Sequence, residues 1–527
     1  MEIFSITSIY ALGVVSLGFL LFFSVFAMVC IFWLMPVCKN NKLRKNGFHG
    51  PSPRFPFGNL MEMRNKNLHQ LPSSSSCFSP SGDHLRTTIS HDIHSTAFSY
   101  FAQWRKTFGR VFVYWLGTEP FLYVSEPEFL KKVTSGSLSK SWGKPNVFKY
   151  DRRPMFGNGL VMVEGDEWDH HRHIIVPAFS IKNLNGMQNL MVETTTNMLE
   201  EWKKLMDIGK HEINVDEYII RNAAEIIAKT SFGISEEDGK MVFEKLQTMQ
   251  TMLFKSNRLV GVPFSKLLSP KKSQEAWKLG KEIDKLLLRI ITSRKDQACT
   301  INGQQDLISI LLEGNKALKK KLTTQELVDE SKTFFFGGHE TTALALTWTL
   351  FLLALYPQWQ KLLREEIMEV SNGDPLDSTM LTKLVKMGWV FNETLRLYSP
   401  APNAQRQARE DIKVGDIFIP KGTNMWIDIV AMHHDRELWG DDVNEFKPER
   451  FMEHNNGGCK HRMGFMPFGF GGRVCVGRNL SITEYKIVLS LILQKFSFSL
   501  SPSYLHSPKI MLTLRPSLGV PLIVHPI

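Results

Sequence analysis

The first 38 residues carry a single charge, on Glu2, and no charged residue occurs from Ile3 to Cys38. Most of the stretch from Ile9 to Met35 is apolar. A helix needs about 20 such residues to cross the core of a bilayer. A cleaved signal peptide has a shorter apolar core of roughly 7–15 residues, a basic leading end and a small-residue cleavage site. The sequence therefore predicts one membrane-anchoring helix rather than a signal peptide or a buried core helix.

A basic and proline-rich segment follows this apolar stretch. Its first cations are Lys39, Lys42, Arg44 and Lys45. Since cytoplasmic flanks of membrane helices are enriched in Lys and Arg, everything after residue 38 is expected in the cytoplasm. The prolines of "GPSPRFPFGN" should stop the helix, and the serine-rich stretch 71–84 is typical of a surface loop. The predicted parts are an anchor at 1–38, a hinge and variable loop at 39–90, and a catalytic domain at 91–527.

Composition narrows the class of protein further. The chain is 43% hydrophobic and 22% charged, which is typical of a globular protein. Its net charge of +11 comes from dispersed basic residues, and no nucleic-acid-binding signature is present. This charge suits a membrane surface or an acidic partner. The six cysteines are sparse and unpatterned, so a disulfide framework is not expected and a reducing compartment is favoured.

Periodicity predicts a mainly α domain with a small β portion. Two β-like runs at 111–117 and 121–125 should form a hairpin, whereas 182–315 has helical periodicity. A longer apolar helix is predicted over 324–355, because "TTQE" is a capping-box start and Pro357 marks its end. From residue 409 the chain changes to short extended pieces and loops.

The middle of that long helix reads "FFFGGHETTALALTW". Gly337 and Gly338 each cost about 1 kcal/mol relative to Ala in a helix interior. Glu340 and Thr341 follow within an apolar surround, where a carboxylate is expensive unless it is paired or used. One hypothesis is a helix that admits a flat group and then delivers protons. The alternative is helix packing through glycine, with Glu340 facing solvent.

Two further motifs pair charged or polar side chains. Glu393 and Arg396 lie three residues apart, a spacing common on exposed helices, but Arg450 in "FKPERF" could complete a buried ion network with them. In "WDHHR" an indole donor and a guanidinium share one helical face. Both of these donors suit a carboxylate ligand.

The stretch "PFGFGGRVCVGRNL", from Pro467 to Leu480, is called the cysteine loop below. Its glycines allow a tight bend that turns backbone N–H groups toward the sulfur of Cys475, and Arg473 is expected to add a cation beside it. No second cysteine or histidine stands at zinc spacing from Cys475. One anionic sulfur with a nearby guanidinium fits haem iron ligated by thiolate, with Arg473 on a propionate.

Together these motifs resemble those of the cytochrome P450 family of haem-thiolate monooxygenases, over essentially the whole chain. The cysteine loop, "GGHETT", E-x-x-R, the PERF segment and W-x-x-x-R all occur in the family's order. "GPSP" stands where many members have a P-P-G-P hinge. The resemblance implies the P450 fold, mainly α with a small β portion, preceded by one N-terminal transmembrane helix. "TFFFGGHETT" and "GRNL" resemble the plant membrane-bound hormone-hydroxylase clan, with cytokinin-hydroxylase-like members nearest.

The resemblance also implies roles for individual residues. Cys475 would be the axial ligand of the haem iron, with Phe468 packed beside its sulfur. Glu340 and Thr341 would form an acid–alcohol pair that relays protons. The donors to the haem propionates would be Trp168, Arg172, Arg406 and Arg473. A structural triad would consist of Glu393, Arg396 and Arg450.

By the same resemblance, the protein would use haem b to insert one oxygen atom from O2 into a C–H bond of a small apolar molecule, a plant hormone or terpenoid-like compound. Electrons would come from NADPH through a separate flavoprotein reductase, and the protein would lie in the endoplasmic reticulum membrane with its catalytic domain in the cytoplasm. The basic residues expected to dock the reductase are Arg172, Lys460, Arg462 and Arg478. The stretches expected to line the substrate pocket are 145–163, 252–265 and 400–405.

Two alternatives remain at this point. One is a haem-thiolate isomerase or dehydratase that works without O2, which the intact "HETT" argues against. The other is a non-enzymatic membrane haem-binding protein.

Overall fold

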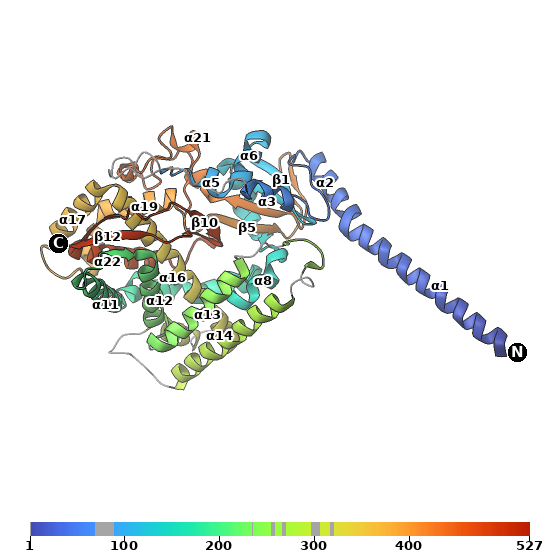
Figure 1. The fold of residues 1–527 in the computed structure, drawn as a ribbon, viewed down its shortest axis with the longest axis horizontal. Helices are drawn as coiled ribbons and strands as arrows, with labels where there is room; N and C mark the ends of the chain where they lie inside the picture. The colour runs from blue at the N-terminus through green and yellow to red at the C-terminus, as the bar shows by residue number, and fades with distance from the viewer. Residues whose placement is uncertain are drawn as a thin grey trace.

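A helical rod projects from the rest of the molecule at its N-terminal end (Figure 1). The computed structural model describes residues 2–68, 89–233, 236–254, 259–265, 270–296, 306–316 and 321–527. The segment 71–84, expected to be a surface loop, lies outside these residues. Helices dominate the described chain and the strands are short, which confirms the mainly α class with a small β portion.

The rod consists of α1 (Glu2–Val29), a π-helical turn η1 (Cys30–Leu34) and α2 (Met35–Lys45). Pro36 lacks a backbone N–H, and the widened π turn directly before it accommodates that loss. The segment Leu12–Lys45 is a candidate membrane span. Its most apolar 18-residue window has a mean hydropathy of 2.7, and 0% of that window is buried. The helix continues past residue 38 to Lys45, where the proline-rich segment begins.

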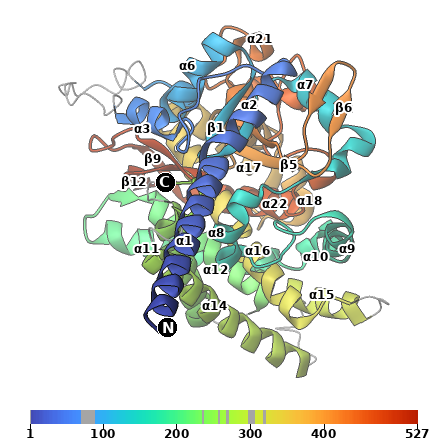
Figure 2. The same cartoon turned by 90° about the vertical axis from the view of Figure 1, so that its right-hand side faces the viewer.

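The five-stranded sheet lies next to the point where the rod joins the body (Figures 1 and 2). The expected hairpin is confirmed, since β1 (Val111–Leu116) and β2 (Glu119–Val124) pair antiparallel from Val111 opposite Val124. The five-stranded sheet has the order β1-β2-β8-β5-β3, and β2 runs parallel to β8. Its other strands are β8 (Asn424–Asp428), β5 (Asn403–Ala408) and β3 (Trp142–Gly143).

Three smaller sheets complete the β portion. Their strands are β4 (Glu212–Asn214), β12 (Pro521–Pro526) and β9 (Phe496–Leu500), then the pair β6 (Ile412–Val414) and β7 (Ile417–Ile419), and the pair β10 (Pro508–Met511) and β11 (Thr513–Pro516). The expected short extended pieces after residue 409 are therefore present.

The helices gather mainly on the side of the molecule away from the five-stranded sheet (Figure 2). The longer ones are α11 (Gln188–Asp207), α12 (Val215–Phe232), α13 (Glu236–Phe254), α14 (Pro270–Asp296), α16 (Thr324–Leu355), α17 (Pro357–Ser371), α19 (Val385–Leu397) and α22 (Arg478–Lys495). The shorter ones are α3 (Leu60–Leu68), α5 (Ile93–Ala97), α6 (Ser99–Phe108), α7 (Pro127–Thr134), α8 (Asn146–Phe156), α9 (Gly165–Ile175), α10 (Ile181–Asn185), α15 (Leu307–Lys316), α18 (Ser378–Lys383), α20 (Ile429–His433) and α21 (Arg436–Trp439).

Helix α16 forms the centre of the body, packed against α12, α14, α19 and α22. Its start is the predicted capping box, because the Thr323 side chain accepts from the N–H of Glu326 while the Glu326 side chain accepts from the N–H of Thr323. Nearly every residue from Leu327 to Leu355 is buried. A helix apolar on all sides is stable in water only when other elements cover it, so the other helices are arranged around α16.

Residues 259–265, which lie between α13 and α14 in the chain, contact the rod and the β1–β2 turn. The N–H of Thr118 donates to the C=O of Gly261 at 2.9 Å, which holds this segment on the β1–β2 turn. The rings of Phe32 and Phe264 lie 6.0 Å apart, and Leu259 and Phe264 are both exposed. Exposed apolar side chains beside a membrane helix can enter the interface of the bilayer.

We predict that deletion of residues 1–38 releases the protein from membranes only in part. Leu259 and Phe264 remain in the truncated form and can contact lipid. Flotation of membranes would measure the bound fraction, and adding Phe264→Asp to the deletion should lower it further. Complete solubility of the truncated protein without salt or detergent would contradict the second contact.

Candidate active site

The cysteine loop has the tight backbone that its glycine pattern predicts. Gly469 and Gly471 have φ values of 77° and 60°, a region that L side chains rarely adopt. The N–H of Cys475 donates to the C=O of Phe468 at 2.9 Å, which closes the loop on itself. The N–H of Gly477 donates to the Cys475 sulfur. The loop therefore holds the thiol at a defined position with a backbone donor aimed at it.

The charges around the Cys475 sulfur differ from the expectation. Cys475 is exposed, yet the surrounding protein desolvates its thiol, and this burial raises its pKa. The Gly477 N–H and the cations Arg172 and Arg478 act in the opposite direction. Arg473, expected beside the sulfur, instead lies with its guanidinium 4.4 Å from the ring centre of Trp168. A bound metal would deprotonate such a thiol, because coordination favours the thiolate.

Trp168 and Arg172 share one face of α9, as their spacing predicts, and this face packs on the cysteine loop. The Arg172 guanidinium lies 5.5 Å from the Trp168 ring centre and donates to the C=O of Val474 at 3.0 Å. A Cβ added at Gly472 would stand 3.2 Å from the Trp168 ring, so the glycine lets the indole approach the loop closely. Helix α9 and the cysteine loop thus bring the side chains of Trp168 and Arg172 and the backbone of the loop into one region.

Arg406 and Arg473 bring further positive charge to the same region. Burial lowers the pKa of Arg406 to about 10, and burial together with Arg406 lowers the pKa of Arg473 to about 10. Burial, followed by Arg406 and Arg473, also lowers the pKa of Lys144 well below its usual range. Arg406 donates to the C=O of Gln405 at 2.9 Å. Arg473 donates to the C=O of Val163 at 3.0 Å, and Glu164 and Asp169 act on its charge. Among the described residues, neither Arg406 nor Arg473 has a carboxylate within ion-pair distance.

The acid nearest to this group of cations is already engaged. Burial raises the pKa of Glu164, but hydrogen bonds from Arg409, Lys149 and the N–H of Lys144 outweigh it and lower the pKa to about 2. Arg409 donates to both carboxylate oxygens of Glu164, at 2.8 and 2.7 Å. Cations that are partly removed from water and have no acidic partner are unfavourable unless an anion meets them. The donor set Arg172, Arg406 and Arg473 therefore fits the two propionates of a haem whose iron lies at Cys475.

The two glycines of α16 play different parts. Gly337 is exposed in the middle of a buried helix, and a Cβ added there would meet no atom within 4 Å. At Gly338 an added Cβ would stand 2.4 Å from Cδ1 of Ile227 on α12. Gly338 therefore serves helix packing, as one hypothesis for "GGHETT" expects. Gly337 leaves room beside the helix, and the admission of a flat group with proton delivery there stays a prediction. The Thr341 hydroxyl donates to the C=O of Gly337 at 2.8 Å.

Glu340 does not face solvent, so that part of the packing alternative is wrong. It is 1% exposed and accepts hydrogen bonds from Gln250 at 2.9 Å, Thr513 at 2.7 Å and Arg515 at 2.5 Å. Burial raises its pKa, but Arg515 and then His339 oppose this, and the net pKa is lowered. The carboxylate is therefore held ionised, on the side of α16 that faces β10 and β11.

Glu393, Arg396 and Arg450 come together in the interior. Glu393 and Arg396 are each 0% exposed and form two parallel hydrogen bonds of 2.7 Å, so the exposed-pair alternative is wrong. Arg450 lies 3.5 Å from the same carboxylate and 2.8 Å from Asp442. Arg396 also donates to the C=O groups of His433, Val443 and Glu445. The ion group thereby joins α19 to the chain that leads into the cysteine loop.

Neither Lys144 nor Arg515 was identified from the sequence. The sequence also did not predict that the Arg478 cation lowers the pKa of the Cys475 thiol. Lys144 lies next to the stretch 145–163 that was expected to line a pocket, and Arg478 ends the glycine pattern of the cysteine loop. Arg515 is 175 positions from Glu340, and no local spacing relates the two. The role of 145–163, 252–265 and 400–405 as pocket lining stays a prediction.

Comparisons with known proteins agree with the motifs. A family model described as "Cytochrome P450" matches residues 87–520. "Cytochrome P450 714C2" of Oryza sativa subsp. japonica is 38% identical over 503 residues, covering 94% of both chains. A "Cytokinin hydroxylase" of Arabidopsis thaliana is 37% identical over 506 residues, covering 95% of both chains. "Cytochrome P450 734A1" of Arabidopsis thaliana is 34% identical over 508 residues, covering 93% of this chain and 92% of the relative.

We predict that Glu393→Gln destabilises the protein by about 3–5 kcal/mol, because it leaves the Arg396 charge buried without its partner. The midpoint of urea unfolding in detergent measures this effect. Glu449→Gln, an exposed acid one residue before Arg450, is the matched control and should leave the midpoint unchanged. Equal midpoints for Glu393→Gln and the native protein would contradict the buried-network interpretation.

Proposed function

The chain belongs to the cytochrome P450 family, and on that premise we propose that it hydroxylates a small apolar molecule of the plant-hormone or terpenoid type. As a P450 it is a haem-dependent monooxygenase that draws electrons from a redox partner. The names of similar proteins support the hormone class, since two relatives at 37% identity are called "Cytokinin hydroxylase". A named relative supports the class of reaction without defining the carbon that is attacked.

One observation carries the proposal. An accessible thiol with a backbone donor lies in the same site as arginines that have no acidic partner in the described chain. A thiolate ligand on one side and propionate-binding cations beside it are the two requirements of haem-thiolate chemistry. Haem b, when bound, would supply the activation of O2, and the protein would supply binding, orientation and proton control.

Cys475 would hold the iron, and its backbone neighbours would set the electron density on sulfur. The Gly477 N–H stabilises negative charge there without adding a mobile proton. Phe468 is partly buried at the loop and would shield the sulfur from water. Trp168, Arg172, Arg406 and Arg473 would bind and orient the propionates.

Thr341 and Glu340 would divide the handling of protons. The Thr341 hydroxyl, beside the space at Gly337, would hold a proton at Oγ1 after exchanging its bond to the Gly337 carbonyl for one to water. Glu340 is ionised, and Gln250, Thr513 and Arg515 all donate to its Oε1, so it would accept a proton from the interior at Oε2. Thr341 and Glu340 would thus handle protons in successive steps, without a hydrogen bond between their side chains.

The remaining assignments concern the surroundings of the enzyme. The electrons would come from NADPH through a flavoprotein reductase that docks on basic residues near the sulfur. Lys460, Arg462 and Arg478 are exposed, and Arg172 is partly exposed. The anchor at 1–38, the hinge at 39–90 and the catalytic domain at 91–527 would place the active site on the cytoplasmic side of the endoplasmic reticulum.

The substrate class can be tested by spectral titration of the full-length protein with plant hormones and terpenoids. A true substrate should displace water and shift the Soret band with saturation. Mass spectrometry of the reconstituted reaction should then find a product heavier by one oxygen atom. A panel in which only molecules outside these classes bind and react would overturn the proposed substrate class.

We predict that Cys475→Ser abolishes the red-shifted Soret band of the ferrous carbon monoxide complex, because an alcohol cannot donate charge as a thiolate does. Difference spectroscopy measures the band. Cys459→Ser changes a buried cysteine outside the site and should leave the band in place. The reverse behaviour of the two variants would show that the ligand is misassigned.

We also predict that Thr341→Ala uncouples turnover while haem content and substrate binding survive. Positioned proton transfer contributes about 10²–10⁴-fold to rates, so product formation should fall steeply while NADPH is still consumed and peroxide appears. The ratio of product to NADPH measures coupling, and Thr341→Ser, which keeps the hydroxyl, should retain most of it. A fully coupled Thr341→Ala enzyme would remove Thr341 from proton delivery.

A further inference from the structure

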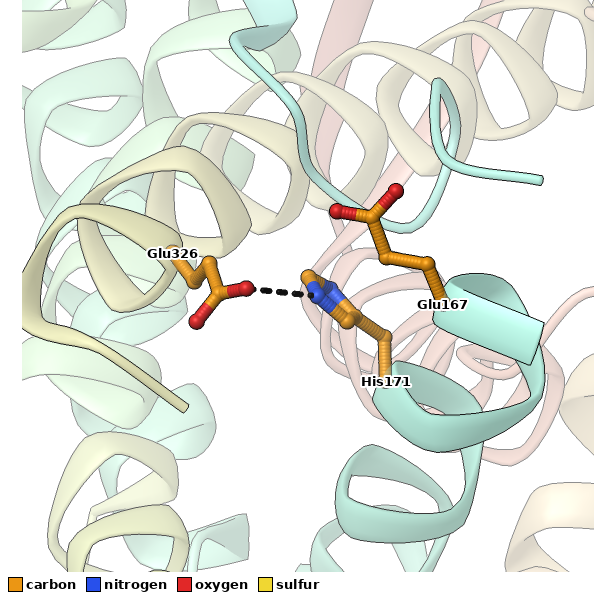
Figure 3. A group of neighbouring side chains, drawn as sticks. All are labelled: Glu167, His171 and Glu326. Carbon is orange, nitrogen blue, oxygen red and sulfur yellow. Dashed lines mark ion pairs between the residues drawn. The ribbon is translucent and has the colours of Figure 1, made fainter. Parts of the chain in front are cut away.

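Helix α9 and the first turns of α16 bring one histidine and two acids together outside the cysteine loop. Figure 3 shows Glu167 and His171 on α9 and Glu326 on α16, with the imidazole of His171 pointing toward the carboxylate of Glu326. Their ligand atoms all lie within 4.8 Å of one another. Glu167 and His171 are one helical turn apart, so both face the start of α16.

Each of the two inner side chains uses one polar atom for a hydrogen bond and turns the other toward its neighbour. Glu326 Oε2 accepts from the N–H of Thr323 at 2.6 Å as part of the capping box. His171 Nδ1 lies 2.6 Å from Oε1 of the buried Glu330. The second pair of atoms, His171 Nε2 and Glu326 Oε1, forms an ion pair of 3.4 Å, drawn as the dashed line in Figure 3. The structure thus orients these two atoms toward a common point, with exposed Glu167 beside it.

Two buried atoms in this group lack a hydrogen-bond partner. The His171 side chain is 0% exposed, yet its Nε2 makes no hydrogen bond, and neither does Oε2 of Glu330. Buried polar atoms are almost always satisfied, so each exception calls for a ligand or another physical cause. Glu167 likewise has no side-chain hydrogen bond or ion pair among the described residues. A cation at the centre would take the place of the His171–Glu326 ion pair and bind His171 Nε2, Glu326 Oε1 and the Glu167 carboxylate together.

We propose that Glu167, His171 and Glu326 form a zinc site between α9 and α16, with Glu330 as the carboxylate that orients His171. A neutral imidazole would bind Zn²⁺ through Nε2, and each glutamate would bind through one oxygen. Water would complete the tetrahedron, because Glu167 is exposed and Glu326 is partly exposed. The hydrogen bond from His171 to Glu330 matches the carboxylate–histidine–zinc arrangement that fixes the ring and raises its basicity.

The ligand set favours zinc over other common divalent ions. Zinc accepts a mixture of nitrogen and oxygen ligands in a four-coordinate site. Calcium takes six to eight oxygen ligands and magnesium an octahedral oxygen shell, and three side chains including an imidazole do not provide either. Ligands on a tetrahedral zinc ion lie about 3.3 Å apart. Rotation of the Glu167 and Glu326 side chains about their flexible bonds would close the present spacing to that value.

Zinc at this position would tie together two helices that carry the active site. Helix α9 bears Trp168 and Arg172, and α16 bears Gly337 and Thr341. The ion would cross-link them some distance from the sulfur and leave the cysteine loop itself untouched. Binding should therefore stabilise the folded protein and depend on Glu167, which takes no part in the existing contacts of His171.

The test uses the untagged full-length holoprotein in detergent, stripped of adventitious metal with a chelator. Zn²⁺ is titrated in competition with a chromophoric chelator, and the expected result is one saturable site. Glu167→Gln and Glu326→Gln should each weaken binding about tenfold or more. Glutamine at 326 still supports a capping box, so that variant keeps the start of α16. Asp166→Asn, an exposed acid next to Glu167, is the matched control and should bind like the native protein.

X-ray absorption at the zinc edge provides a second readout that does not depend on activity. The expected shell contains one imidazole nitrogen and oxygen donors at about 2.0–2.1 Å, without sulfur. A sulfur shell would place the metal on a cysteine and overturn the proposal. Absence of a saturable site, or an affinity that Glu167→Gln leaves unchanged, would show that His171 serves only as an ion-pair centre for Glu326 and Glu330.

Discussion

Burial of α16 across the whole body of the protein dictates how the other elements must be arranged. Every polar group on a covered helix needs a partner inside the protein, since water cannot reach it. Glu340 finds Arg515, Thr513 and Gln250, while Thr341 bonds back to its own helix at the Gly337 carbonyl. Only Gly337 is left exposed in this stretch, and the proposed chemistry lies beside it.

Charge is matched in one part of the interior and unmatched in another. The Glu393–Arg396 pair has two hydrogen bonds of equal length and carbonyl acceptors for the remaining donors, which makes it a neutral, rigid support. Arg406 and Arg473 have no carboxylate within ion-pair distance in the described chain, and partial burial lowers the pKa of each. The first arrangement suits structure and the second suits recognition of an anion.

Local patterns in the sequence predicted local structure well. The capping box at Thr323 and Glu326, the limits of the long helix and the β1–β2 hairpin all depend on neighbours within a few residues, so spacing alone is informative. The partnership of Arg450 with Glu393 was expected from the motif order, and the structure brings the two side chains to 3.5 Å. Arg515 could not be predicted, because its meeting with Glu340 depends on how the C-terminal β10–β11 pair folds over α16. The same holds for His171 and Glu330, whose contact joins two helices far apart in the chain.

The central claim is that this chain transfers an oxygen atom from O2 to its substrate under the control of the Cys475 site. The most direct test is the reaction of the full-length protein with a reductase, NADPH and a binding substrate under ¹⁸O2, followed by mass spectrometry of the product. The account predicts a product that carries one ¹⁸O atom derived from O2. A product without the label, formed equally well when O2 or NADPH is withheld, would contradict it and would instead support an isomerase or dehydratase.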